Sequence, residues 1–205
     1  MLVPPLFDEM NRMRRMLVGV LEALEGLSVG GFLPDLPGTN ESQVALDRVT
    51  LSDWQDAMAA CARQHGISHI ASFRGGVLTV SGLNAANHWI FTPAKGAAIL
   101  RTMLRTKVAA DRESGLNTSI ADLTIRAGKA PLELAGNIIG SELFAQLDAA
   151  DIPTFESQNV VRLESDNKPS DRQITGSALW LRAEPDDDPA MSLAIGRDIA
   201  EWVKQ

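Results

Sequence analysis

An apolar heptad stripe at the amino end is the most regular pattern in this sequence. Its members recur at alternating intervals of four and three residues: Leu6, Met10, Met13, Leu17, Val20, Leu24 and Leu27. This spacing places every member on one stripe of an α-helix, the surface that helices use to pack lengthwise. The pattern therefore predicts an amphipathic helical segment over residues 1–27.

What covers this stripe is open between two alternatives. Phe7 and Leu21 each lie one position beyond a member of the stripe and widen its apolar face, which is typical of a helix docked on its own domain. The methionines Met10, Met13 and Met16 add adaptable surface that suits exchangeable partners. We expect the stripe to bind a second copy of the chain or another protein, with docking inside the chain as the alternative.

Composition limits the classes of protein to consider. With 205 residues, 45% of them hydrophobic and 22% charged, the chain can bury a sizeable core in one medium domain. A formal charge of −7 disfavours nucleic acid as a partner, and no apolar run reaches the roughly 20 residues of a membrane span. Cys61 is the only cysteine, which excludes an intramolecular disulfide and favours the cytoplasm.

Glycine, proline and polar residues divide the chain into segments. Residues 28–42 are rich in these types and predict a linker or an ordered loop, which leaves 43–205 as a single domain. The expected helices of that domain are 53–64, 93–113, 131–150 and 189–203, and the expected strands are 69–73, 77–80, 87–91, 160–163 and 178–181. Residues 120–125 suit either a strand or a helix.

The grouping of the strands predicts the fold class. Residues 74–76, Arg-Gly-Gly, read as a hairpin turn between two strands, and the strands do not alternate one by one with helices. We therefore expect an α+β fold, with a mostly antiparallel sheet of about five short strands packed with four to five helices, plus the amino-terminal amphipathic helix. The order of elements over residues 50–204 resembles the small acidic dimeric chaperones of bacterial secretion systems. That resemblance carries over no residue.

Metal-binding patterns are weak in this sequence. Cys61, His65 and His69 are spaced by four, but Gly66 is expected to end the helix that would align them. The acidic run that ends at Asp188 precedes Pro189, which is the pattern of a helix cap rather than of a cation site. We therefore expect no metal and no cofactor.

Two groups of polar residues are candidate small-ligand sites. His69, Arg74 and His88 lie on or beside the expected strands at 69–91 and could line a pocket, with Asp53 or Asp122 as further members. Arginine guanidinium groups pair well with oxyanions, and Arg101, Arg105 and Arg112 share one face of the 93–113 helix. That row is a candidate anion-binding surface, although a solvated rim beside the core gives the same pattern.

These observations favour binding over catalysis. The sequence contains no G-x-x-x-x-G-K-[ST] or G-x-G-x-x-G motif, and we assign no catalytic residue. The leading hypothesis is a non-enzymatic cytoplasmic adaptor, regulator or chaperone-like homo-oligomer that acts through its amino-terminal helix and sheet surface. The alternatives are a small enzyme or ligand-binding domain with a pocket near 69–91, and nucleic-acid or phosphate binding through the arginine-lined helix.

Overall fold

A computed structural model describes residues 1–84 and 86–205 and contains a five-stranded sheet in which all strands run parallel. In spatial order the strands are β1 (Leu2–Val3), β2 (His69–Phe73), β3 (Asn87–Phe91), β6 (Gln158–Leu163) and β7 (Arg172–Ile174). The helices are α1 (Asp8–Gly26), α2 (Leu51–Gln64), α3 (Gly96–Glu113), α4 (Ile120–Ala127), α5 (Ser141–Ala149) and α6 (Pro189–Val203). Three short 3-10 helices, η1 (Leu46–Arg48), η2 (Arg74–Val80) and η3 (Leu179–Leu181), and a hairpin of β4 (Leu132–Leu134) with β5 (Asn137–Ile139) complete the described elements.

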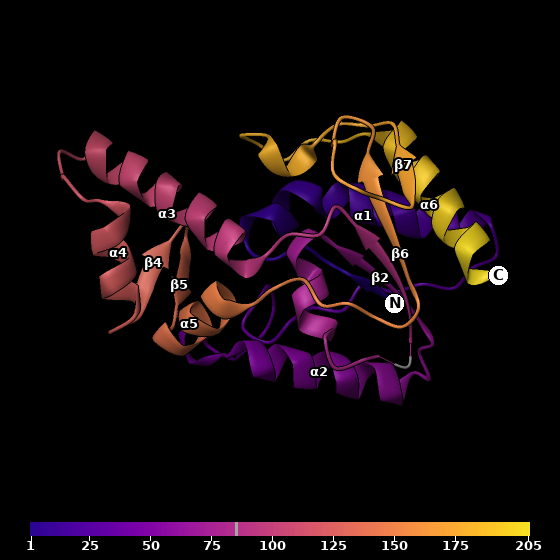
Figure 1. Cartoon of the computed structure of the whole chain (residues 1–205), viewed down its shortest axis with the longest axis horizontal. Helices are drawn as coiled ribbons and strands as arrows, with labels where there is room; N and C mark the ends of the chain where they lie inside the picture. Colours follow the sequence, from indigo (N-terminus) through magenta and orange to yellow (C-terminus); the bar gives the residue numbers. More distant parts are fainter. Residues whose placement is uncertain (85) are drawn as a thin grey trace.

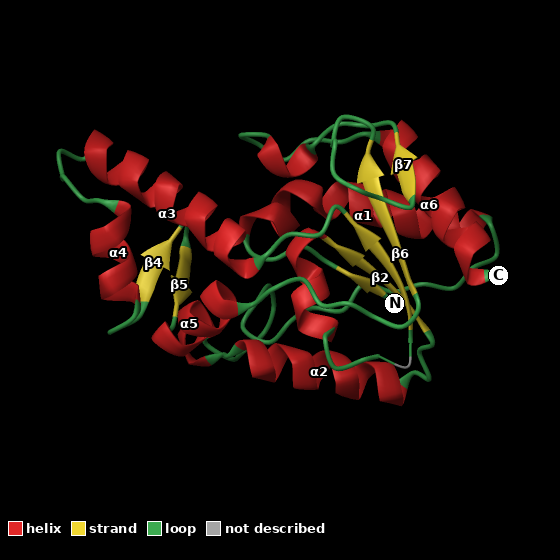
Figure 2. Ribbon diagram, viewed as in Figure 1, coloured by secondary structure: helices red, strands yellow, loops and turns green. Residues whose placement is uncertain are grey.

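Helices cover both faces of the sheet, so the molecule has three layers (Figures 1 and 2). On one face, α1 and α6 pack together over a core that includes Phe73, Trp89 and Phe91. On the other face, α2, η2, α3 and α5 enclose a second core that includes Ile70 and Ile90. The fold is therefore α/β.

The predicted α+β fold with a mostly antiparallel sheet is wrong. Residues 74–76 do not form a hairpin turn, because η2 leads the chain from β2 to a parallel β3. Gly76 is needed for close packing, because a Cβ there would lie 2.2 Å from the Pro4 carbonyl oxygen, whereas a Cβ on Gly75 would meet only the end of the Ile99 side chain, at 2.3 Å. β2 and β3 are buried on both faces, which is why apolar residues occupy adjacent positions, such as Ile70 and Ala71 or Trp89 and Ile90, instead of alternating with polar ones.

Other elements also differ from their predicted form. The predicted helix 131–150 begins with the β4–β5 hairpin, which turns at Ala135 and Gly136 with φ of 48° and 76°, and only its second half is helical. The predicted strand 178–181 is η3, and the last strand of the sheet is β7 instead. Residues 120–125 belong to α4, whereas the strands at 69–73, 87–91 and 160–163 are confirmed. The resemblance to secretion chaperones depends on the predicted element order, so the observed topology removes its basis.

The amino-terminal stripe is packed inside the chain. Its first six members are buried and Leu27 is partly buried; Leu6 belongs to the core cluster of α2 and α3, and the others belong to the cluster of α6 and the sheet. Loop 28–42 packs against the rest of the protein. Leu36 is buried, and the Phe32 carbonyl accepts a hydrogen bond from the Leu2 amide at 2.9 Å. The structure therefore supports docking of the stripe within its own chain, which was the alternative to binding a partner.

Residues 96–150 form an arm that extends from one end of the sheet (Figure 1, left). It comprises α3, α4, the hairpin and α5, and its buried leucines, such as Leu123 and Leu143, belong to the same core cluster as β2 and β3. In the described part of the chain, no helix has both the length and the apolar character that crossing a bilayer requires.

Candidate ligand-binding site

The carboxyl edge of the parallel sheet concentrates unusual backbone conformations. Phe7, Arg74 and Thr92 follow β1, β2 and β3, and their φ angles are 54°, 55° and 42°. Side-chain-bearing residues rarely adopt positive φ, and each such position costs about 1–3 kcal/mol. Phe7 and Thr92 are also buried, so packing holds this strain in place. Backbone strain of this kind is found preferentially at functional sites.

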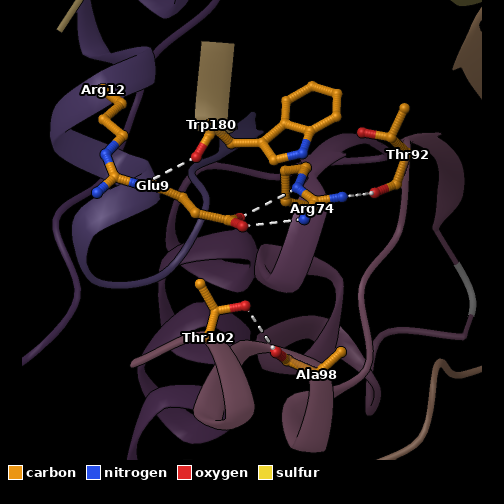
Figure 3. Close-up of polar contacts among 7 residues, drawn as sticks. All are labelled: Glu9, Arg12, Arg74, Thr92, Ala98, Thr102 and Trp180. Atoms are coloured by element: carbon orange, nitrogen blue, oxygen red, sulfur yellow. Dashed lines mark hydrogen bonds and ion pairs between the residues drawn. The ribbon is translucent and has the colours of Figure 1, made fainter. Parts of the chain in front are cut away.

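Arg74 is the central charged residue of this edge (Figure 3). Its Nε and Nη2 donate to the two carboxylate oxygens of Glu9, in the first turn of α1, at 3.1 and 2.9 Å. Its Nη1 donates to the Thr92 carbonyl oxygen at 3.1 Å. The side chains of Arg74 and Glu9 are only 17% and 16% exposed. The pair is therefore a largely desolvated, bidentate guanidinium–carboxylate contact, which is the stronger class of ion pair.

Trp180 of η3 covers the guanidinium. The Cζ atom of Arg74 lies 4.4 Å from the indole ring centroid, within the range of a cation–π contact. Arg12 of α1 donates from Nη1 to the Trp180 carbonyl oxygen at 3.0 Å and also pairs with Asp8 at 3.4 Å (Figure 3). Partial burial raises the pKa of Asp8, against the opposing effects of Arg12 and of a hydrogen bond with Asn137.

Thr92 brings an unused hydroxyl group to this edge. Its side chain is buried, and among the described residues its Oγ1 has no hydrogen-bond partner. The Thr92 amide donates to the Val161 carbonyl oxygen at 2.8 Å, and the Thr92 carbonyl accepts from Arg74. Both backbone polar groups of Thr92 are therefore hydrogen-bonded. Most buried polar groups in proteins are hydrogen-bonded to protein atoms or to ordered water.

A pocket of about 70 Å³ opens beside the Arg74–Glu9 pair. α1, α3 and η3 line it, and its wall combines the charged pair with apolar side chains such as Leu6, Ile99 and Met103. Thr102 of α3 lies at this wall and donates its hydroxyl to the Ala98 carbonyl oxygen at 3.2 Å (Figure 3). Leu181 is 75% exposed beside the pocket. The edge thus offers an oxyanion-binding fork next to a small apolar recess.

The structure does not bring together the three residues predicted to line a pocket. His69 begins β2 and Arg74 follows its end, so a strand length of about 17 Å separates them. His88 is buried near the amino end of β3, where its ring stacks on Phe155 at 3.5 Å and its Nε2 contacts the Leu83 carbonyl oxygen at 2.9 Å. Of the three, only Arg74 lines the carboxyl-edge pocket.

Asp53 and Asp122, the other two acidic candidates, cap helices. Each accepts hydrogen bonds from a residue three positions earlier, Thr50 for α2 and Ser119 for α4. The hydroxyl donors lower the pKa of both carboxyl groups. Neither residue belongs to the pocket at the carboxyl edge.

The arginine row lies on the surface of the arm. Arg101, Arg105 and Arg112 are all exposed on α3, and none of them forms an ion pair within residues 1–84 and 86–205. Anion binding by this row stays a prediction.

No group of three or more metal-ligating side chains is present in the described residues. Cys61 is a free, partly buried thiol. Asp188 caps α6 through the Met191 amide at 3.0 Å, and Asp187 pairs with Arg15 at 2.8 Å, so helix capping is confirmed for this acidic run.

Sequence reasoning missed Glu9, Thr92 and Trp180. Thr92 could have been found from its position directly after a strand, had the strands been read as parallel. Glu9 was not singled out because acidic residues are common in the first turn of a helix, where it lies. No protein family, curated protein or solved structure matches this sequence.

Proposed function

We propose that this protein binds a small ligand at the carboxyl edge of its sheet, in the pocket beside Arg74 and Glu9. The observation that carries the proposal is the largely buried Arg74, held directly after β2 by a carboxylate, a carbonyl and an indole ring. Ligands of open α/β sheets commonly bind outside the carboxyl ends of the strands.

The size and lining of the pocket support a small ligand. A volume of about 70 Å³ is far below the roughly 300–1,000 Å³ of sites for drug-sized molecules, so the ligand has few non-hydrogen atoms. An apolar wall with a small number of convergent polar groups is the usual composition of such sites. All three histidines lie elsewhere in the structure, and the acidic lining residues Asp8 and Glu9 are each paired with an arginine, so the proposed function is binding.

Fragment screening by NMR tests this function. Fragments that bind are expected to shift the backbone amide signals of Phe7, Arg74, Thr92 and Trp180. Thr102→Trp places a large side chain at the pocket wall and should abolish these shifts. Thr124→Trp is the matched control, because Thr124 is also exposed, on α4, and makes the same contact with the carbonyl four residues earlier. Binding that maps elsewhere, or that survives Thr102→Trp, would contradict the proposal.

A cytoplasmic homo-oligomer is a second candidate, and one observation favours it. Four large apolar side chains are exposed on the arm: Leu116, Ile120, Ile125 and Ile138. Large contiguous apolar patches on a surface commonly mark protein contacts, and the partner proposed for the arm is a second copy of this chain. Light scattering after size-exclusion chromatography should give a dimer or larger species that dissociates in Ile125→Ser/Ile138→Ser. A wild-type protein that is monomeric in this measurement would exclude the homo-oligomer.

A further inference from the structure

The contact between Arg74 and Glu9 has the form of a bound carboxylate. Two adjacent N–H groups of the guanidinium, on Nε and Nη2, each meet one oxygen of the same carboxyl group. The guanidinium fork pairs in this parallel way with carboxylates and with phosphates, and in this structure the partner is a carboxylate. Glu9 thus occupies the position that the carboxyl group of a ligand would take.

Glu9 can leave this position without unfolding the helix that bears it. It lies in the first turn of α1, and the buried residues of that helix, such as Met13 and Leu17, hold the helix on the sheet independently. Asp8 remains beside the positive end of the helix dipole when the Glu9 side chain turns away. A glutamate has enough free rotamers to reach solvent from a position that is already 16% exposed.

One further feature suits an incoming carboxylate with a short apolar tail. The recess beside Arg74 has apolar walls at Leu6, Ile99 and Met103, and its charged lining consists of the two ion pairs Arg74–Glu9 and Arg12–Asp8. A carboxyl group alone would leave this apolar recess empty.

We infer that the ligand of this site is a short-chain aliphatic carboxylate, whose carboxyl group replaces that of Glu9 on Arg74 and whose tail enters the apolar recess. This inference rests on the proposed function and names its ligand class. Glu9 is then an internal competitor that closes the site when no ligand is bound. Trp180, stacked over the guanidinium, shields the ion pair from water in both states.

Butyrate and butyramide are the probes that test the ligand class. They have the same size and shape, and only butyrate carries a carboxylate. Titrations followed through the amide signals of Arg74 and Thr92, at constant ionic strength, should show butyrate binding about tenfold more tightly than butyramide, because the charge-assisted pair is lost in the amide. Equal affinities would overturn the carboxylate inference while leaving the small-ligand function intact.

Glu9→Gln tests the competition. The substitution keeps the size of the side chain and removes its charge, so butyrate should bind about tenfold more tightly to this variant than to the wild-type protein. Glu22→Gln is the matched control, because Glu22 is exposed on the same helix and its replacement changes the net charge equally. If both variants gain the same affinity for butyrate, the gain comes from the change in net charge alone, and the inference is contradicted.

Absence of butyrate binding to both the wild-type protein and Glu9→Gln would overturn the inference outright. If fragment screening then also finds no ligand at the carboxyl edge, the proposed function fails with it. If screening finds neutral fragments whose binding Thr102→Trp abolishes, only the carboxylate class is wrong.

Discussion

Arg74 joins three segments that are far apart in the sequence. Its guanidinium contacts Glu9 at the start of α1, Thr92 after β3 and Trp180 in η3. A guanidinium with five N–H donors and two flat faces can make all of these contacts at once, which a lysine ammonium cannot. The Arg74 side chain therefore holds these three segments together at the carboxyl edge of the sheet.

His88 predicts a loss of stability in mild acid. Burial lowers the pKa of His88 below its ordinary value of 6.5, against the opposing effect of the contact with the Leu83 carbonyl. Below pH 6.5 the unfolded chain binds a proton that the folded chain does not, so the free energy of unfolding falls as the pH drops from 6.5 towards the lowered pKa. Each unit of pKa difference contributes about 1.4 kcal/mol.

Urea unfolding at a series of pH values measures this effect. His88→Gln keeps a hydrogen-bond donor for Leu83 and removes the titrating group, so its stability should change less between pH 7.5 and 5.5 than that of the wild-type protein. His65→Gln, at the exposed end of α2, is the control. An unchanged pH dependence in His88→Gln would assign the acid sensitivity to other groups.

The site could be predicted from the sequence only in part, because its members depend on strand direction. Arg74 stood out as a charged residue directly after an apolar strand, and it does line the pocket. Thr92 has the same relation to β3, but in an antiparallel sheet the two would lie at opposite edges. Trp180 was assigned to a strand, since a short apolar run suits strand and helix equally well.

At the level of elements, the approach of η2 to the β1–α1 connection depends on Gly76. A Cβ at this position would lie 2.2 Å from the Pro4 carbonyl oxygen and 2.9 Å from that of Val3, and both are backbone atoms that cannot move independently. Gly76→Ala should therefore reduce the free energy of unfolding by about 1–3 kcal/mol or more.

Chemical denaturation compares this variant with a control. Gly82→Ala adds the same methyl group where nothing lies within 4 Å, so it should be neutral or slightly stabilising. Equal stability of Gly76→Ala and Gly82→Ala would show that η2 does not pack against Pro4 as described.

Most individual elements could be predicted because their local signals are strong. The Asp188-Pro189 start of α6 is an example, whereas α2 begins at a Thr50–Asp53 capping box, two residues before its predicted start at 53. The direction of strand pairing has no comparable local signal. Gly75-Gly76 between apolar runs is typical of a hairpin, and only the three-dimensional structure reveals that Gly76 permits close packing.

At the scale of the whole molecule, two cores share one sheet. The cluster under α1 and α6 and the cluster under α2, α3 and α5 contact opposite faces of the same strands, and the arm contributes its leucines to the second cluster. The chain should therefore unfold in one cooperative transition.

Two probes can test this cooperativity. The tryptophans, at 54, 89, 180 and 202, all lie outside the arm, whereas helical circular dichroism includes the arm helices. The fluorescence and dichroism transitions should coincide. Leu143 is a fully buried arm residue, so Leu143→Ala should lower the free energy of unfolding obtained from either signal by about 2–5 kcal/mol. A separate dichroism transition would mean that the arm unfolds independently.

The central claim is that Arg74 exchanges the Glu9 carboxylate for that of a ligand. The most direct test follows the side-chain Nε–H signal of Arg74 and the indole Nε1–H signal of Trp180 by NMR during a butyrate titration. We predict that both signals move along one saturable curve, while the indole signal of Trp202, at the opposite end of β2 beside His69, stays in place. An Arg74 signal that remains unchanged at saturating butyrate would show that the pair with Glu9 is a fixed structural contact.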